Sequence, residues 1–141
     1  MKKILVPCDG SDNALRAVRH AATSARENPS IEIELLHVLD PMTFKSQAAL
    51  LSPDELSRLC PDEANHVLQP ARRILEEGAI PYRVRCRVGP AAGEIAAQVH
   101  ESGSDGVIMG TRGMGQIASV MIGSVASRVV HLVDVPVTLV K

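Results

Sequence analysis

Residues 107–125 of this 141-residue chain read VIMGTRGMGQIASVMIGSV, and this stretch decides the fold. It opens with an uninterrupted apolar run, which is typical of a strand buried on both faces. The run breaks at Gly110 into a loop with further glycines, and Gly123 and Ser124 then begin a segment with helical periodicity. The stretch therefore predicts a buried strand, a glycine loop and a helix in immediate succession.

The start of this helix is suited to holding an anion. First-turn N–H groups have no partners within a helix, and the helix dipole places partial positive charge there. Glycine at positions 110, 113 and 123 lets the backbone approach a phosphate that a Cβ would obstruct, and the Ser124 hydroxyl adds a donor. The loop and the helix start together favour a phosphate-containing ligand.

Strand and helix patterns alternate along the rest of the chain. We expect strands at residues 3–8, 31–38, 82–88, 107–109 and 135–140, and helices at residues 12–27, 53–78, 92–102 and from 124 onward. Right-handed crossovers between parallel strands then predict a doubly wound α/β sheet. Segment 82–88 alternates arginine with apolar residues, which indicates an edge strand with one wet face.

Several residues predict where the helices begin and bend. Ser11 or Asp12 is expected to cap the first helix, and Ser52 opens a capping box for the second. We expect a break with a second helix start at Pro61. We also expect a bend near Leu68, because Pro70 removes one backbone hydrogen bond of the helix. One face of the last helix is expected to carry Val125, Val129 and Leu132, with Val130 beside them.

The spacing of the glycines is specific. Gly110, two residues, Gly113, nine residues and then Gly123-Ser124 resembles the ATP-binding signature of the universal stress protein family. The resemblance extends from the opening KKILVPCDGS through LLHVLD to the closing VPVTLVK. The pattern is neither a P-loop, because no lysine follows the last glycine, nor the G-x-G-x-x-G dinucleotide fingerprint.

The resemblance implies a complete fold. It is a single domain over residues 1–141, Rossmann-like and similar to the adenine nucleotide alpha hydrolases. Its five-stranded parallel sheet has the order 3-2-1-4-5, with helices on both faces. That order puts the first and fourth strands side by side where the winding reverses, and ligands bind beyond the carboxyl ends of strands at such a point. Those ends lie near Asp9 and Gly110, so the topology and the glycine pattern predict the same crevice.

The family pattern also implies an ATP-binding set, which in this sequence is Pro7, Asp9, Val38, Met109, Gly110, Gly113, Gly123, Ser124 and Val125. Asp9 resembles the carboxylate on the ribose or metal side and would meet Mg²⁺ or Mn²⁺ through the nucleotide, although a helix cap is the alternative. The Val38 backbone would meet adenine, and Met109 would flank the base or simply belong to the core. Arg112 is outside the signature; it could pair with a phosphate or point into solvent.

Composition excludes several classes of ligand and site. The formal net charge is −1 and the aromatic residues are Phe44 and Tyr82, so we expect no nucleic-acid partner. No apolar stretch approaches the length of a membrane span or a signal peptide, so we expect a cytoplasmic protein without a membrane partner. Neither the cysteines nor the histidines have metal-site or catalytic spacing, and Cys8 is expected to be a buried thiol.

Two classes of function remain. The first is a regulatory or stress-response module that binds ATP, hydrolyses it slowly at most, and acts on an unidentified protein partner. The second is an enzyme that transfers an adenylyl or phosphoryl group from ATP. Phosphoryl transfer usually needs a P-loop-type lysine, metal carboxylates and a base, and only Asp9 offers itself, so we favour the module. A third reading, an interaction domain with a vestigial loop, is weakened by the complete glycine pattern.

The last strand predicts self-association. Residues 135–140, from Val135 to Val140, are apolar on both faces yet close the sheet at an edge. Soluble proteins normally cover or pair such an edge, and members of the family often pair these strands antiparallel. We therefore expect a homodimer through this strand.

Overall fold

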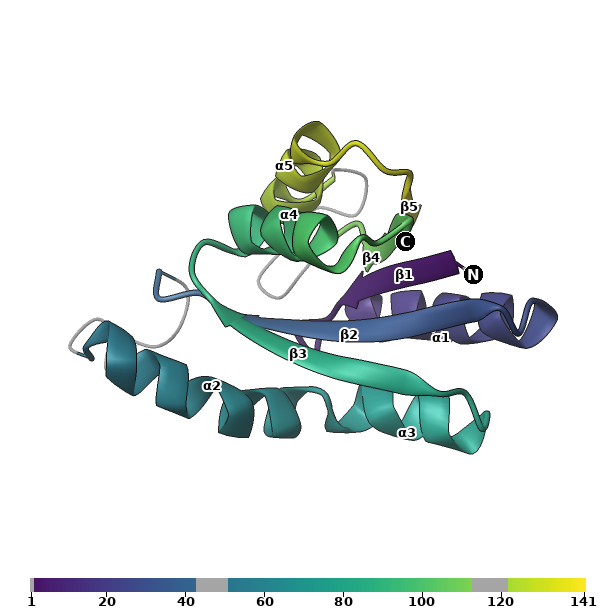
Figure 1. Cartoon of the computed structure of the whole chain (residues 1–141), viewed down its shortest axis with the longest axis horizontal. Coiled ribbons are helices and arrows are strands. Elements are labelled where there is room, and N and C mark those ends of the chain that lie inside the picture. The colour runs from purple at the N-terminus through teal and green to yellow at the C-terminus, as the bar shows by residue number, and fades with distance from the viewer. Residues whose placement is uncertain (1, 43–50, 113–121) are drawn as a thin grey trace.

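The computed structural model describes residues 2–42, 51–112 and 122–141. A five-stranded sheet forms its centre, in the order β3-β2-β1-β4-β5, and each pair of neighbouring strands is parallel (Figure 1). The strands are β1 (Lys2–Pro7), β2 (Ile31–Leu39), β3 (Tyr82–Val88), β4 (Gly106–Gly110) and β5 (Val137–Val140). The predicted fold class and strand order are confirmed.

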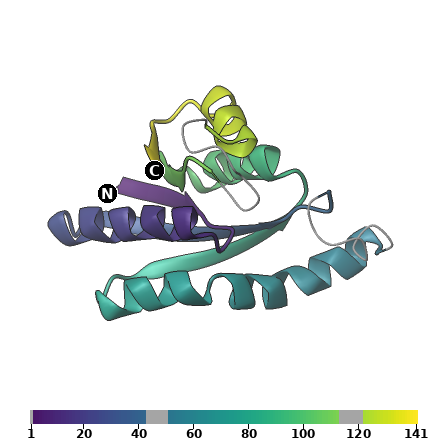
Figure 2. The same ribbon diagram turned by 180° about the vertical axis from the view of Figure 1, so that it is seen from behind.

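Helices cover both faces of this sheet. The helices α1 (Asp12–Glu27), α2 (Pro53–Val67) and α3 (Gln69–Glu77) lie on one face, and α4 (Ala91–Ser102) and α5 (Ser124–Leu132) lie on the other (Figures 1 and 2). None of the helices in the described part of the chain is long and apolar enough to cross a membrane.

The core follows the two-residue alternation of the central strands. Leu5, Leu36 and Val107 point toward α4 and α5, whereas their neighbours Val6 and Leu35 point toward α1 and α3. Central strands of a parallel sheet are buried on both faces, which is why they read as continuous apolar runs in the sequence.

Helix caps agree with the sequence, but one expected break does not. The Ser11 side chain accepts the Ala14 N–H, and Ser52 forms the predicted capping box. The expected second start at Pro61 is wrong, because α2 runs through this proline without interruption. Buried neighbours hold α2 against the sheet on both sides of Pro61, so packing outweighs the one backbone bond that the proline removes. The helix ends instead at Val67, and Leu68, the predicted position of the bend, separates it from α3.

The two edges of the sheet differ from each other. β3 is the edge strand that the sequence predicts, but Arg87 is half-buried and its guanidinium contacts Glu94 at 2.8 Å and Glu101 at 2.5 Å on α4. β5 forms the opposite edge and is shorter than the predicted 135–140.

The inward face of α5 differs from the prediction. Ala126 and Val129 are buried, whereas Val125, Val130 and Leu132 are exposed. The apolar face named from the sequence is therefore wrong apart from Val129. The apolar residues of this short helix are spread around its circumference, so periodicity does not single out one face. Packing against the neighbouring elements decides which face is buried.

Candidate functional site

A cavity of about 500 Å³ opens beyond the carboxyl ends of β1, β2 and β4. It lies where β1 and β4 pair and the winding of the sheet reverses, the place at which open α/β sheets bind ligands. Every described residue of the predicted ATP-binding set lines it, namely Pro7, Asp9, Val38, Met109, Gly110, Gly123, Ser124 and Val125. Gly113 lies outside the described residues. The fold thus brings residues from the ends of β1, β2 and β4 and from the start of α5 into one cavity.

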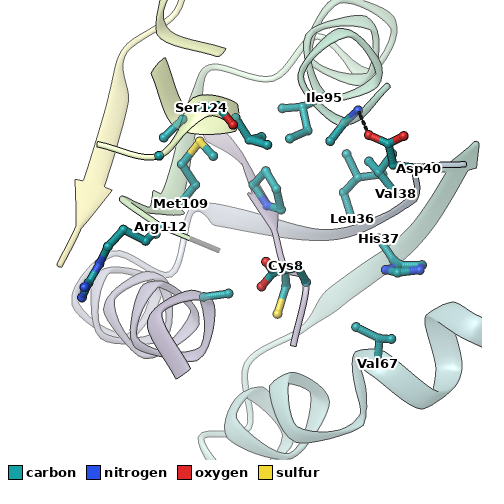
Figure 3. Close-up of a pocket in the computed structure, with 18 of the residues that line it drawn as sticks. Cys8, Leu36, His37, Val38, Asp40, Val67, Ile95, Met109, Arg112 and Ser124 are labelled. Atoms are coloured by element: carbon teal, nitrogen blue, oxygen red, sulfur yellow. Dashed lines mark hydrogen bonds between the residues drawn. The ribbon is translucent and has the colours of Figure 1, made fainter. Parts of the chain in front are cut away.

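One wall of the cavity is apolar. Leu36 and Val38 at the end of β2, Met109 at the end of β4 and Ile95 on α4 pack into one cluster (Figure 3). Cavities for small organic ligands are mostly lined in this way, with a few polar groups that fix orientation. This wall offers aliphatic and thioether surface to an apolar part of a ligand.

Among the described helices, α1, α2, α4 and α5 begin on this side of the sheet, and they differ in what covers their first-turn N–H groups. Ser52 caps α2. Ser11 caps α1, and the Asp40 carboxylate accepts the Ala91 N–H at the start of α4, at 3.1 Å (Figure 3). At α5 the N-cap is Gly123, and no described side chain caps the helix. The start of α5 therefore presents its donors and its dipole to the cavity, which suits an anion.

Asp9 and Arg112 both line the cavity and both have structural roles. The Asp9 carboxylate accepts the Ser11 N–H at 3.0 Å, so it shapes the turn before α1, whose N-cap is Ser11 and not Asp9. The Arg112 backbone N–H donates to Asn13 Oδ1 at 2.7 Å, while its side chain extends away from the middle of the cavity (Figure 3). Within the described ranges, no group of three or more His, Cys, Asp or Glu is arranged to hold a metal ion.

Asn13 does not line the cavity itself, but it contacts the lining residues Gly110 and Arg112, and no sequence pattern marked it. It is buried at the start of α1, where its amide also donates to the Val140 carbonyl at 2.9 Å. A Cβ added to Gly110 would lie only 2.5 Å from Asn13 Oδ1, which gives that glycine a packing reason besides close approach to a ligand. The only sequence signal was a polar residue among the inward positions of an otherwise apolar helix face.

His37 also lines the cavity unexpectedly, on the side of α2 (Figure 3). It is 8% exposed, and neither ring nitrogen has a hydrogen-bond partner among the described residues. Burial lowers the pKa of His37, while the Glu63 and Asp9 carboxylates and the nearby Cys8 carbonyl oppose that shift. The Cys8 carbonyl lies close enough to favour the protonated ring, but it does not form a hydrogen bond with either ring nitrogen. Both nitrogens are inaccessible, so His37 faces the cavity through carbon atoms.

Cys8 is a buried thiol, as predicted. It is 4% exposed, and burial raises its pKa to about 11. Because the thiolate is the nucleophilic form, this cysteine is unreactive at neutral pH.

Comparisons with known proteins agree with the geometry. The model of the universal stress protein family matches residues 1–141. Universal stress protein MJ0531 of Methanocaldococcus jannaschii is 32% identical over 99% of this chain and 82% of its own length. The solved structure of MJ0577 from the same organism has a TM-score of 0.82 at 30% identity, covering 99% of this chain and 95% of that one. The structure of a universal stress protein from Archaeoglobus fulgidus in complex with dAMP has a TM-score of 0.71 at 23% identity, covering 100% and 98% of the two chains.

Proposed function

This chain belongs to the universal stress protein family, and on that premise we propose that it is a regulatory or stress-response module that binds ATP in the cavity beyond β1 and β4. The observation that carries the proposal is the start of α5. Of the four helix starts on this side of the sheet, it is the one without a side-chain cap among the described residues, and it opens into the cavity. Its N–H groups and the Ser124 hydroxyl would bind phosphate.

The remaining lining suits the rest of an adenine nucleotide. Val38 and Met109 would enclose the base, and Asp9 would face the ribose or a nucleotide-bound Mg²⁺ or Mn²⁺. The metal would supply charge neutralisation at the phosphates. That a protein of this fold has been solved with dAMP supports an adenine nucleotide as the ligand class.

The same lining argues for holding ATP rather than turning it over. Backbone donors at a helix start bind the ground state and the transition state alike, and uniform binding does not raise the turnover rate. Fast phosphoryl transfer also needs a group that positions the attacking oxygen. Asp9 is the one carboxylate carried over from the family pattern, and it already accepts the Ser11 N–H. We therefore propose a regulatory module whose binding to a protein partner depends on whether nucleotide is bound.

Replacing Gly123 by valine tests this proposal. Gly123 has φ −64° and ψ 161°, an extended conformation that valine adopts without strain, so the domain should still fold. The new side chain would stand beside the first-turn donors of α5, and we expect ATP affinity measured by calorimetry to fall at least about tenfold, or 1.4 kcal/mol. The control is Gly93→Val on α4, where an added Cβ meets nothing within 4 Å. Equal ATP affinity in the two variants would contradict a phosphate site at α5.

We further propose that residues 1–141 act as one domain and pair as a homodimer through β5. The carbonyls of Pro136 and Val140 accept bonds from Val107 and Thr111, so by strand alternation the polar groups of Val137 and Leu139 point to the open edge. An edge with unpaired groups is a template for another strand. Exposed Val130 and Leu132 on α5 add apolar surface.

The oligomeric state is measured by sedimentation at micromolar concentration. We expect a dimer for the wild type and a monomer for Thr138→Lys, because lysine on an edge strand opposes pairing. Thr23→Lys, on the exposed side of α1, is the matched control and should remain dimeric. A monomeric wild type, with or without ATP, would reject the dimer.

A further inference from the structure

Asn13 joins three segments that are far apart in the chain. Its Nδ2 donates to the Val140 carbonyl at the end of β5, 127 residues away, at 2.9 Å. Its Oδ1 accepts the N–H of Arg112, 99 residues away, at 2.7 Å. Asn13 is 6% exposed and both bonds are partly buried, so losing either partner would leave a largely buried polar group unsatisfied.

The backbone that leaves β4 is pressed closely against this amide. A Cβ on Gly110 would lie 2.5 Å from Asn13 Oδ1 and 3.1 Å from the Asn13 backbone carbonyl carbon, so only glycine allows the approach. The next residue, Thr111, donates its N–H to the same Val140 carbonyl at 2.9 Å. Asn13 therefore bonds both the backbone that follows β4, at Arg112, and the end of β5, at Val140.

The same exit is bonded to the start of α5. The Gly123 N–H donates to the Thr111 carbonyl at 2.6 Å, and Gly123 is the N-cap of α5. A continuous series of hydrogen bonds thus runs from Asn13, through residues 111 and 112, to the helix start that lines the cavity. Helix donors bind an anion well only if they are fixed before it arrives, because ordering them on binding costs free energy.

We propose that Asn13 is a positioning residue for the phosphate end of the site. It fixes the backbone of residues 111–112 and, through the bond between Gly123 and Thr111, the start of α5. The inference rests on the proposed function, since it assigns Asn13 to the same nucleotide site. A carboxamide suits this position because one planar group both donates and accepts; aspartate could not donate to Val140, and leucine could do neither.

A ligand series separates this role from a general effect on stability. Adenosine has the base and ribose but no phosphate, so the ratio of ATP affinity to adenosine affinity measures the phosphate contribution. We expect Asn13→Ala to lower that ratio about fivefold, which corresponds to about 1 kcal/mol, the typical net value of one hydrogen bond. Adenosine affinity should stay unchanged. Val18→Ala, a buried truncation on the same helix, should lower the melting temperature and leave the ratio unchanged.

Hydrogen exchange of the Arg112 amide in the nucleotide-free protein provides a second measurement. We expect slow exchange in the wild type and in Val18→Ala, and faster exchange in Asn13→Ala, because this N–H loses its acceptor. If Asn13→Ala does not fold, Asn13→Ser is measured in its place, and the same reduction of the ratio is expected.

The outcomes separate this inference from the proposed function. A wild type that binds neither ATP nor adenosine would overturn the proposed function, and the role of Asn13 with it. A wild type that favours ATP over adenosine, with the same ratio in the Asn13 variant, would uphold the phosphate site and overturn the positioning role. Equal losses for both ligands would also overturn it, since they would indicate only a structural role.

Discussion

Replacing His37 by leucine should stabilise the protein. Both ring nitrogens are buried and unpaired among the described residues, and leaving a buried polar group unsatisfied costs about 1–3 kcal/mol. Leucine has a similar volume, and volume-conserving swaps usually cost less than about 1.5 kcal/mol. We therefore expect a net gain of about 1 kcal/mol at pH 8, where the histidine is neutral. For a chain of this size, that gain raises the melting temperature by about 3–4 °C.

The gain should grow as the pH falls. Burial lowers the pKa of His37 from its ordinary value of 6.5, although Glu63, Asp9 and the Cys8 carbonyl favour its protonation. The unfolded chain therefore takes up this proton at a higher pH than the folded protein does, so acid favours unfolding. Below pH 6.5 the wild type should lose up to about 1.4 kcal/mol per pH unit from this group until the lower folded pKa is reached. The leucine variant lacks this loss.

Urea unfolding followed by circular dichroism at pH 8 and at pH 5.5 measures both effects. The control is His20→Leu, at an exposed position on α1, where the same substitution removes no buried polar group and should bring no gain in stability at pH 8. A His37→Leu variant less stable than the wild type at pH 8 by more than about 1 kcal/mol would show that the ring is hydrogen-bonded. If the free energy of unfolding changed equally with pH in His37→Leu and in the wild type, the titration assigned to His37 would be refuted.

Three further predictions address other parts of the molecule. Gly110→Ala forces Asn13 aside and should destabilise the protein by about 1–3 kcal/mol in urea unfolding; an unchanged midpoint would mean that the contact relaxes freely. Arg87→Met removes the half-buried contact with Glu94 and should cost about 1–2 kcal/mol, with less difference in a Glu94→Gln background, as a double-mutant cycle would measure. ATP consumption by the purified protein with Mg²⁺ or Mn²⁺ should be well below the roughly 1–100 per second typical of kinases; several turnovers per second that vanish in Asp9→Ala would make the protein an enzyme.

The sequence by itself determined the elements and the place of the cavity. Glycine spacing after a buried strand marked the start of α5, and the alternation in β3 marked an edge. Ser11 and Ser52 marked helix starts. These signals are local, because caps, strand alternation and glycine turns depend on residues a few positions apart. The strand order came from the family resemblance, and parallel strands then placed their carboxyl ends at one edge.

Only the tertiary structure decided what those residues contact. Asn13 reads as an ordinary helix residue until its partners, 99 and 127 residues away, are brought to it. Pro61 predicted a break that packing on the sheet overrides, and the inward face of α5 is chosen by its neighbours. His37 has no sequence signal, because the loss of its hydrogen-bond partners is a property of the packed interior. Contacts between distant segments exist only after the chain has folded, so no local pattern encodes them, and these contacts fix the site.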